Sequence, residues 1–186
     1  MKGMLAGIAL VCLFGCESVT TEPATPWGPI NGVSFVPNDA FFLASVQDNG
    51  DYNFVLIAAD QVGYCPILQQ NLAGYPSNLT YAIFVISNPI GSGAVNPAPG
   101  PYPVTDAYGP TASSQVTYGS TANCVVGPTL TADAGSLVMT GLAGDLSGMN
   151  GTVAVSFGTA GSLTGSFAAP LCDTSNAVQG QAQCFQ

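Results

Sequence analysis

Residues 151–169, GTVAVSFGTAGSLTGSFAA, decide the fold class. Val153, Val155 and Phe157 fall on one side of an extended chain, whereas the residues between them are small. A period of two is typical of a strand with one buried face. The four residues at 158–161, GTAG, are suited to a tight connection to a second strand. This stretch therefore predicts two neighbouring antiparallel strands.

Similar apolar runs recur along most of the chain, separated by residues that favour turns. Strands are expected at 40–47, 53–59, 79–87, 136–142, 151–157 and 162–169, with an edge strand near 102–104. The run at 79–87 is typical of a central, buried strand, and the Asn-Gly pair at 49–50 predicts a hairpin between the first two strands. A short helical turn is expected around 67–72, and a long proline-rich loop over 88–111.

These patterns predict an all-β protein, built as a single antiparallel β-sandwich of about eight strands. We expect the sandwich domain to span residues 30–186. Residues 1–15 are expected to form a signal peptide. Residues 16–29, rich in Pro and Thr, are expected to form an extended tether that ends near Trp27, the only Trp.

The charge balance of the chain excludes several classes of ligand. Among 186 residues there are ten carboxylates, one basic residue, Lys2, and no His. A nucleic-acid backbone needs Lys or Arg to neutralise it, so we expect no nucleic-acid binding. Electrostatic docking on anionic lipid head groups is excluded for the same reason. A fold without ion pairs should also keep its stability from neutral pH down to about pH 4.

The N-terminal residues 1–16, MKGMLAGIALVCLFGC, have the order of a secretory signal. Lys2 supplies a short positive region, and residues 4–14 form an apolar run of the length used for secretion. That run is too short to span a bilayer, which takes about 20 apolar residues in a helix. The segment therefore predicts an exported protein.

The end of this segment, Leu13-Phe14-Gly15-Cys16, resembles the lipobox of bacterial lipoproteins. The resemblance implies cleavage before Cys16, a lipid on the Cys16 thiol, and attachment to the membrane through acyl chains. Glu17, where an Asp is associated with inner-membrane retention, implies delivery to the outer membrane. The alternative is an ordinary secretory peptide that is cut nearby and leaves Cys16 as a plain thiol.

A second resemblance concerns residues 151–172, GTVAVSFGTAGSLTGSFAAPLC, together with PGPYPV at 99–104. These stretches are similar to the C-terminal half of many myxobacterial-type lipoproteins, which carry a Gly-Thr-Val strand and then a Gly-Ser-Phe strand that ends in Ala-Pro-x-Cys. The resemblance implies a β-rich domain. It implies no biochemical activity, because that group has none assigned.

Four cysteines remain once Cys12 leaves with the signal and Cys16 takes lipid: Cys65, Cys124, Cys172 and Cys184. An even number in an exported protein predicts two disulfides, and three pairings are open. We favour Cys65–Cys172 and Cys124–Cys184, because Cys172 closes the lipoprotein-like stretch and Cys184 lies in the tail. A zinc site is disfavoured, since the sequence has no C-x-x-C pair and no His.

Catalysis has few side chains to use. General-base chemistry most often uses His, and Ser or Cys nucleophiles need a neighbouring base. Many of the acids stand beside turn-forming residues, where Asp caps the backbone: Asp48, Asp51, Asp60, Asp106, Asp133 and Asp145. We therefore expect no enzyme. A glycosidase that uses two carboxylates about 5–9 Å apart is the remaining catalytic alternative.

One cation site can be named from the sequence. Asp48, Asn49, Asp51 and Asn53 place four oxygen-bearing side chains in one tight turn, as calcium sites do. The opposing interpretation is a plain hairpin tip, for which Asn-Gly already accounts. Calcium is the only cofactor the sequence brings forward.

Two binding roles remain. The first is a non-enzymatic, lipid-anchored β module of the cell envelope, structural or protein-binding. The second is a carbohydrate-binding module that stacks sugars on exposed aromatic rings, for which the candidates are Trp27, Tyr102, Tyr108 and Tyr118. A row of exposed rings favours the second role, and scattered buried rings favour the first.

Overall fold

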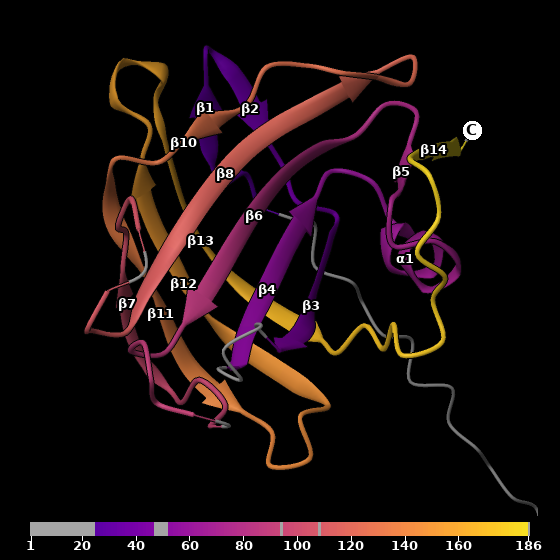
Figure 1. Ribbon diagram of the computed structural model, residues 1–186. Coiled ribbons are helices and arrows are strands. Elements are labelled where there is room, and N and C mark those ends of the chain that lie inside the picture. The colour runs from indigo at the N-terminus through magenta and orange to yellow at the C-terminus, as the bar shows by residue number, and fades with distance from the viewer. Residues whose placement is uncertain (1–24, 47–51, 94, 108, 186) are drawn as a thin grey trace, which may run out of the picture.

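The computed structural model describes residues 25–46, 52–93, 95–107 and 109–185 of the chain. Strands dominate this part, and two large sheets lie face to face (Figure 1). The elements are β1 Gly28–Ile30, β2 Val33–Phe35, β3 Asp39–Val46, β4 Tyr52–Ala59, α1 Tyr64–Gln70, β5 Gly74–Pro76, β6 Thr80–Ser87, β7 Gly100–Pro103, β8 Ser113–Ala122, β9 Val125–Val126, β10 Leu130–Thr131, β11 Ala134–Leu142, β12 Gly148–Ser156, the short 3-10 helix η1 Gly158–Ala160, β13 Ser162–Pro170 and β14 Gln183–Phe185.

The larger sheet has the strand order β10-β8-β6-β4-β3, with β9 paired to β8. β3 and β4 form an antiparallel hairpin in which Phe42 lies opposite Leu56, as the Asn-Gly pair between them predicts. β6, which carries the apolar run at 79–87, lies between β4 and β8. The prediction of a central strand there is confirmed.

The second sheet has the order β13-β12-β11-β7. β11, β12 and β13 follow one another in the chain and pair as antiparallel neighbours. Val153 in β12 lies opposite both Leu137 in β11 and Gly165 in β13. Burial in β12 alternates residue by residue, as the period of two at 151–157 predicts. β7 is the edge strand expected near 102–104.

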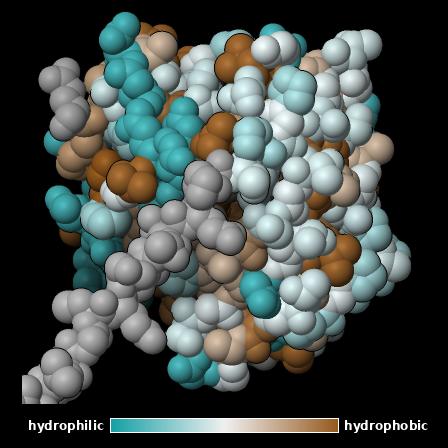
Figure 2. All heavy atoms as spheres, turned by 180° about the vertical axis from the view of Figure 1, so that it is seen from behind, coloured by the Kyte–Doolittle hydropathy of each residue, from teal (hydrophilic) through white to brown (hydrophobic). Residues whose placement is uncertain are grey.

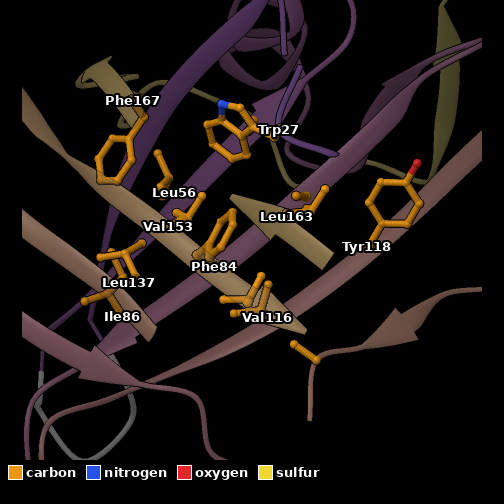
Figure 3. Packing of buried hydrophobic residues seen from close by; sticks show 14 of the residues in the cluster. Trp27, Leu56, Phe84, Ile86, Val116, Tyr118, Leu137, Val153, Leu163 and Phe167 are labelled. Carbon is orange, nitrogen blue, oxygen red and sulfur yellow. The ribbon is translucent and has the colours of Figure 1, made fainter. Parts of the chain in front are cut away.

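One hydrophobic core lies between the two large sheets. Leu56, Phe84 and Val116 face it from the larger sheet, and Leu137 and Val153 face it from the smaller one (Figure 3). These five side chains are at most 1 % exposed. Since both sheets contribute to one cluster, each sheet shields the apolar face of the other from water.

A smaller cluster covers the opposite face of the larger sheet. α1 packs there, and Leu68 joins Phe41, Ile57 and Cys172 in burial. The helix includes most of the turn expected around 67–72 and begins three residues earlier, at Tyr64. The larger sheet therefore has apolar contacts on both faces beneath α1.

The expected architecture holds only at the level of an all-β class. The described residues form four sheets rather than one eight-stranded sandwich, and β14 pairs with β5 in parallel. Strands of two or three residues, such as β5, β9 and β14, are too short to show alternation in the sequence. The finer expectation of a single antiparallel unit therefore missed these peripheral pairs.

The folded domain also begins earlier than residue 30. Trp27 is 3 % exposed in the central core. Its backbone N–H donates to Phe35 O at 2.9 Å, and its carbonyl accepts from Thr164 N at 2.6 Å. The Pro- and Thr-rich composition before Gly28 suggested a tether up to residue 29, but the large apolar surface of the indole favours burial over exposure.

Candidate functional site

Two of the sequence-derived sites fall on residues outside the described part of the chain. Cys16 is one of them, so lipid attachment stays a prediction. Asp48, Asn49 and Asp51 of the calcium candidate also lie outside, and Asn53 is buried at the start of β4. Within the described residues, no group of three or more His, Cys, Asp or Glu side chains could hold a metal ion.

The aromatic candidates do not form an exposed row. Trp27, Tyr102 and Tyr118 are each at most 9 % exposed, and Tyr108 lies outside the described residues. The Tyr102 hydroxyl donates to Ala98 O at 2.6 Å, and burial raises the pKa of Tyr102 and Tyr118. The alternative of sugar stacking requires exposed rings, and these three rings are buried, because β7 and β8 turn their tyrosines into the core.

Most described carboxylates accept a hydrogen bond from a backbone N–H. The donors belong to five separate places in the fold: Gly63 for Asp39, Thr80 for Asp60, Gly158 for Asp133, Ser147 for Asp145 and Ser175 for Asp173. Hydrogen bonds from Ser147 and Ser175 lower the pKa of Asp145 and Asp173 below their usual range. A general acid needs a raised pKa, which is opposite to the shift of Asp145 and Asp173. All five carboxylates have the geometry of turn caps.

The four cysteines of the domain form two disulfides, Cys65–Cys172 and Cys124–Cys184, with Cα–Cα distances of 5.8 and 5.5 Å. These are the two pairs that the sequence analysis favoured. The first joins α1 to the residues that follow β13, and the second joins the β8–β9 turn to β14. The disulfides therefore fix both the helix and the C-terminal segment to the sheets.

A pocket that the sequence analysis missed lies between the end of α1 and the C-terminal segment. Its volume is about 650 Å³. Its walls carry four amide side chains and one aromatic ring, and we call it the amide pocket: Gln70, Asn71, Gln181, Gln183 and Phe185, with Val178, Gly180 and Ala182 between them. No charged side chain is among them. Its two sides lie more than 100 residues apart in the chain, so no local motif could reveal it.

Asn71 is the buried amide of the amide pocket. This side chain is 7 % exposed, donates to Gln181 O at 3.1 Å and accepts from Ala73 N at 2.9 Å. The backbone adds a bond from Leu72 N to Val178 O at 3.2 Å. Asn71 thus holds the C-terminal segment against the helix end. In contrast, Gln70, Gln181 and Gln183 are exposed.

A second hollow, of about 550 Å³, lies at the β11–β12 turn and the end of β13. Apolar and small residues line it, among them Leu142, Met149 and Pro170. The surface seen from behind, over the smaller sheet, is mostly pale in Figure 2, which marks residues of intermediate hydropathy. Exposed side chains there are small, such as Thr152, Thr164 and Ser166.

No protein-family model, curated protein or solved structure matches the chain. Among the described residues, no helix is long and apolar enough to cross a membrane.

Proposed function

We propose that the chain is an exported lipoprotein, anchored through Cys16, whose β domain is a non-enzymatic binding module of the cell envelope. The two disulfides carry this proposal. Disulfides form and persist in oxidising compartments, and they are rare in reducing ones. They agree with the secretory order of residues 1–16.

The position of the domain supports the proposed anchor. Ten residues, 17–26, separate Cys16 from Trp27, where the chain enters the core. A Pro- and Thr-rich segment of this length suits a spacer between a lipid and a folded domain. The domain has no basic side chain for anionic lipid, so the acyl chains would be its only hold on a membrane. Outer-membrane delivery, inferred from Glu17, belongs to the same proposal.

A binding role suits the domain better than catalysis. We take the two large sheets and their shared core as one sandwich, made rigid by two cross-links. Five of its carboxylates cap backbone N–H groups at separate places, which disfavours the two-carboxylate glycosidase. Sugar stacking on Trp27, Tyr102 or Tyr118 is disfavoured by their burial.

The anchor is tested with a palmitate analogue that carries a clickable group. Wild-type protein is expected to take up the label and to fractionate with membranes, and Cys16→Ser is expected to lose both properties. Cys12→Ser is the matched control, because Cys12 lies in the segment expected to be removed; it should behave as wild type. Label that persists in Cys16→Ser, or that disappears only in Cys12→Ser, would contradict the proposal.

A further inference from the structure

We propose that the amide pocket binds a neutral oligosaccharide. This inference rests on the proposed binding role and names the class of ligand. The pocket volume of about 650 Å³ lies within the range of small-ligand sites, about 300–1,000 Å³.

The absence of charged side chains in the pocket wall disfavours ionic ligands. None of the side chains that line the pocket is charged. An anionic ligand would find no Lys, Arg or His in the domain, whose formal charge is strongly negative. A cationic ligand would find no carboxylate in the pocket wall and would lose hydration without an ion-pair partner. The complementary ligand is therefore uncharged and polar.

The amides supply the groups that recognise hydroxyls. A Gln side chain offers two N–H donors and one carbonyl acceptor, and a hydroxyl both donates and accepts. The side chains of Gln70, Gln181 and Gln183 are exposed at the pocket and form no hydrogen bond with another described residue. Gln181 and Gln183 stand two residues apart, a spacing that places side chains on one face of an extended chain. Three amides without a hydrogen-bond partner among the described residues thus line one pocket.

An apolar wall completes the match to a sugar. Phe185 is half-buried at the pocket, and Val178, another residue of the pocket wall, is 65 % exposed. A pyranose ring has a C–H face, which packs on apolar or aromatic surface, and a rim of hydroxyls. Ligand sites commonly combine apolar walls with a few placed polar groups. Phe185 would provide the aromatic surface for sugar stacking, a role for which the sequence suggested rings that are buried in the structure.

The pocket is also organised before any ligand arrives. The Asn71 side chain is held by two hydrogen bonds: its amide nitrogen donates to Gln181 O, and its amide oxygen accepts from Ala73 N. β14 pairs with β5, and Cys184, between Gln183 and Phe185, is cross-linked to Cys124. A site held in place loses less conformational entropy when it binds. The free amides therefore project from a fixed backbone.

A peptide is the rival ligand. Peptides that add to a sheet edge are held mainly by backbone hydrogen bonds and side-chain pockets. The amide pocket instead presents side-chain amides between a helix end and a segment, which favours a ligand that is recognised by its hydroxyls. An uncharged peptide is included in the test for this reason.

The experiment titrates the full chain, extracted in detergent, with cellotetraose, maltotetraose, chitotetraose and tetra-alanine by calorimetry. At least one oligosaccharide is expected to bind, and Gln181→Leu is expected to weaken it by about tenfold, the effect of one lost hydrogen-bonding partner. Gln70→Leu should weaken it similarly. Gln69→Leu is the matched control: it is the exposed neighbour of Gln70 and does not line the pocket.

Equal melting temperatures would show that the variants fold. The inference is overturned if no oligosaccharide binds, if tetra-alanine alone binds, or if Gln69→Leu weakens binding as much as Gln70→Leu. The same titration on Cys16→Ser protein separates the two proposals. Oligosaccharide binding by Cys16→Ser protein would support the pocket independently of the anchor, and the palmitate labelling of wild type tests the anchor alone.

Discussion

Gly165 allows the Trp27 indole to lie directly on the backbone of β13. A Cβ at this position would overlap Cδ1 and Nε1 of the indole. The ring also meets Phe35 and Phe84 edge to face, with centroid distances of 6.0 and 6.2 Å. The contact closes the side of the core where the chain enters the domain.

Gly165→Ala is expected to lower the free energy of unfolding by about 1–3 kcal/mol, because the added methyl must displace a packed ring. Urea denaturation followed by tryptophan fluorescence measures it. Gly148→Ala in β12 is the control, since the nearest atom to its added Cβ would be Ala169 O at 4.0 Å. That variant should match wild type or gain less than about 1 kcal/mol. Equal losses in both variants would contradict this account of Gly165.

Tyr64 couples stability to alkaline pH. Burial, and then the neighbouring Tyr81, raises the pKa of Tyr64 to about 12. Its ring packs edge to face on Phe41, with the centroids 5.8 Å apart. Because the folded pKa is raised above the unfolded one, this contribution to stability is complete below about pH 10 and is lost as the pH rises towards 12.

Tyr64→Phe has no phenol to ionise, so its free energy of unfolding should fall less than that of wild type between pH 9 and pH 11.5. Urea denaturation at the two pH values gives the comparison. Parallel losses in wild type and variant would show that Tyr64 has no part in alkaline unfolding.

At the residue scale, pattern could predict burial but not the direction of every ring. The alternation at 151–157 gave the buried face of β12 correctly. Trp27 and Tyr102 stand among prolines, where composition suggests loops, yet both lie in the core. Their placement depends on contacts with β13 and β11, which are distant in the chain.

At the scale of elements, the Cys65–Cys172 disulfide holds α1 on the outer face of the larger sheet. It spans 107 residues and joins the small cluster of Phe41, Ile57 and Leu68. α1 has seven residues, fewer than an isolated helix needs for stability in water. The helix therefore depends on this cross-link and on its apolar contacts.

Cys65→Ala combined with Cys172→Ala is expected to lower the free energy of unfolding by about 2–5 kcal/mol, since it releases a long loop. Cys124→Ala combined with Cys184→Ala, which opens a loop of 60 residues, should cost slightly less. Chemical denaturation of both double variants measures this. A loss below about 1 kcal/mol for the first would refute a stabilising role.

Long strands could be predicted from the sequence, and short ones could not. The β3–β4 hairpin, central β6 and the meander β11–β12–β13 each carry a pattern over seven or more residues. β5 and β14 have three residues each, and their parallel pairing joins segments far apart in the chain. The register of such a pair has no local signal.

At the scale of the whole molecule, net negative charge and turn-capping carboxylates set the response to acid. The pKa of Asp145 and of Asp173 is lowered by hydrogen bonds, so their contribution is present above the unfolded pKa and is lost only as the pH falls below about 4. Repulsion between carboxylates also weakens as the pH falls. Melting temperature is therefore expected to stay nearly level between pH 7 and pH 4. A steep fall across that range, seen by calorimetry, would contradict this.

The amide pocket also belongs to this scale. It forms only when the C-terminal segment docks against α1, so its amides are scattered in the sequence over positions 70 to 183. Aromatic rows and carboxylate pairs give local or compositional signals in a sequence. Neutral amides from distant segments give neither signal.

The central claim is that an exported chain, cut before Cys16, carries lipid and two disulfides. The intact mass of protein extracted from membranes tests it most directly. The account predicts the mass of residues 16–186 plus acyl groups, less the hydrogens of the Cys65–Cys172 and Cys124–Cys184 bonds. An unacylated mass, or one that includes residues 1–15 or the hydrogens of free thiols, would contradict it.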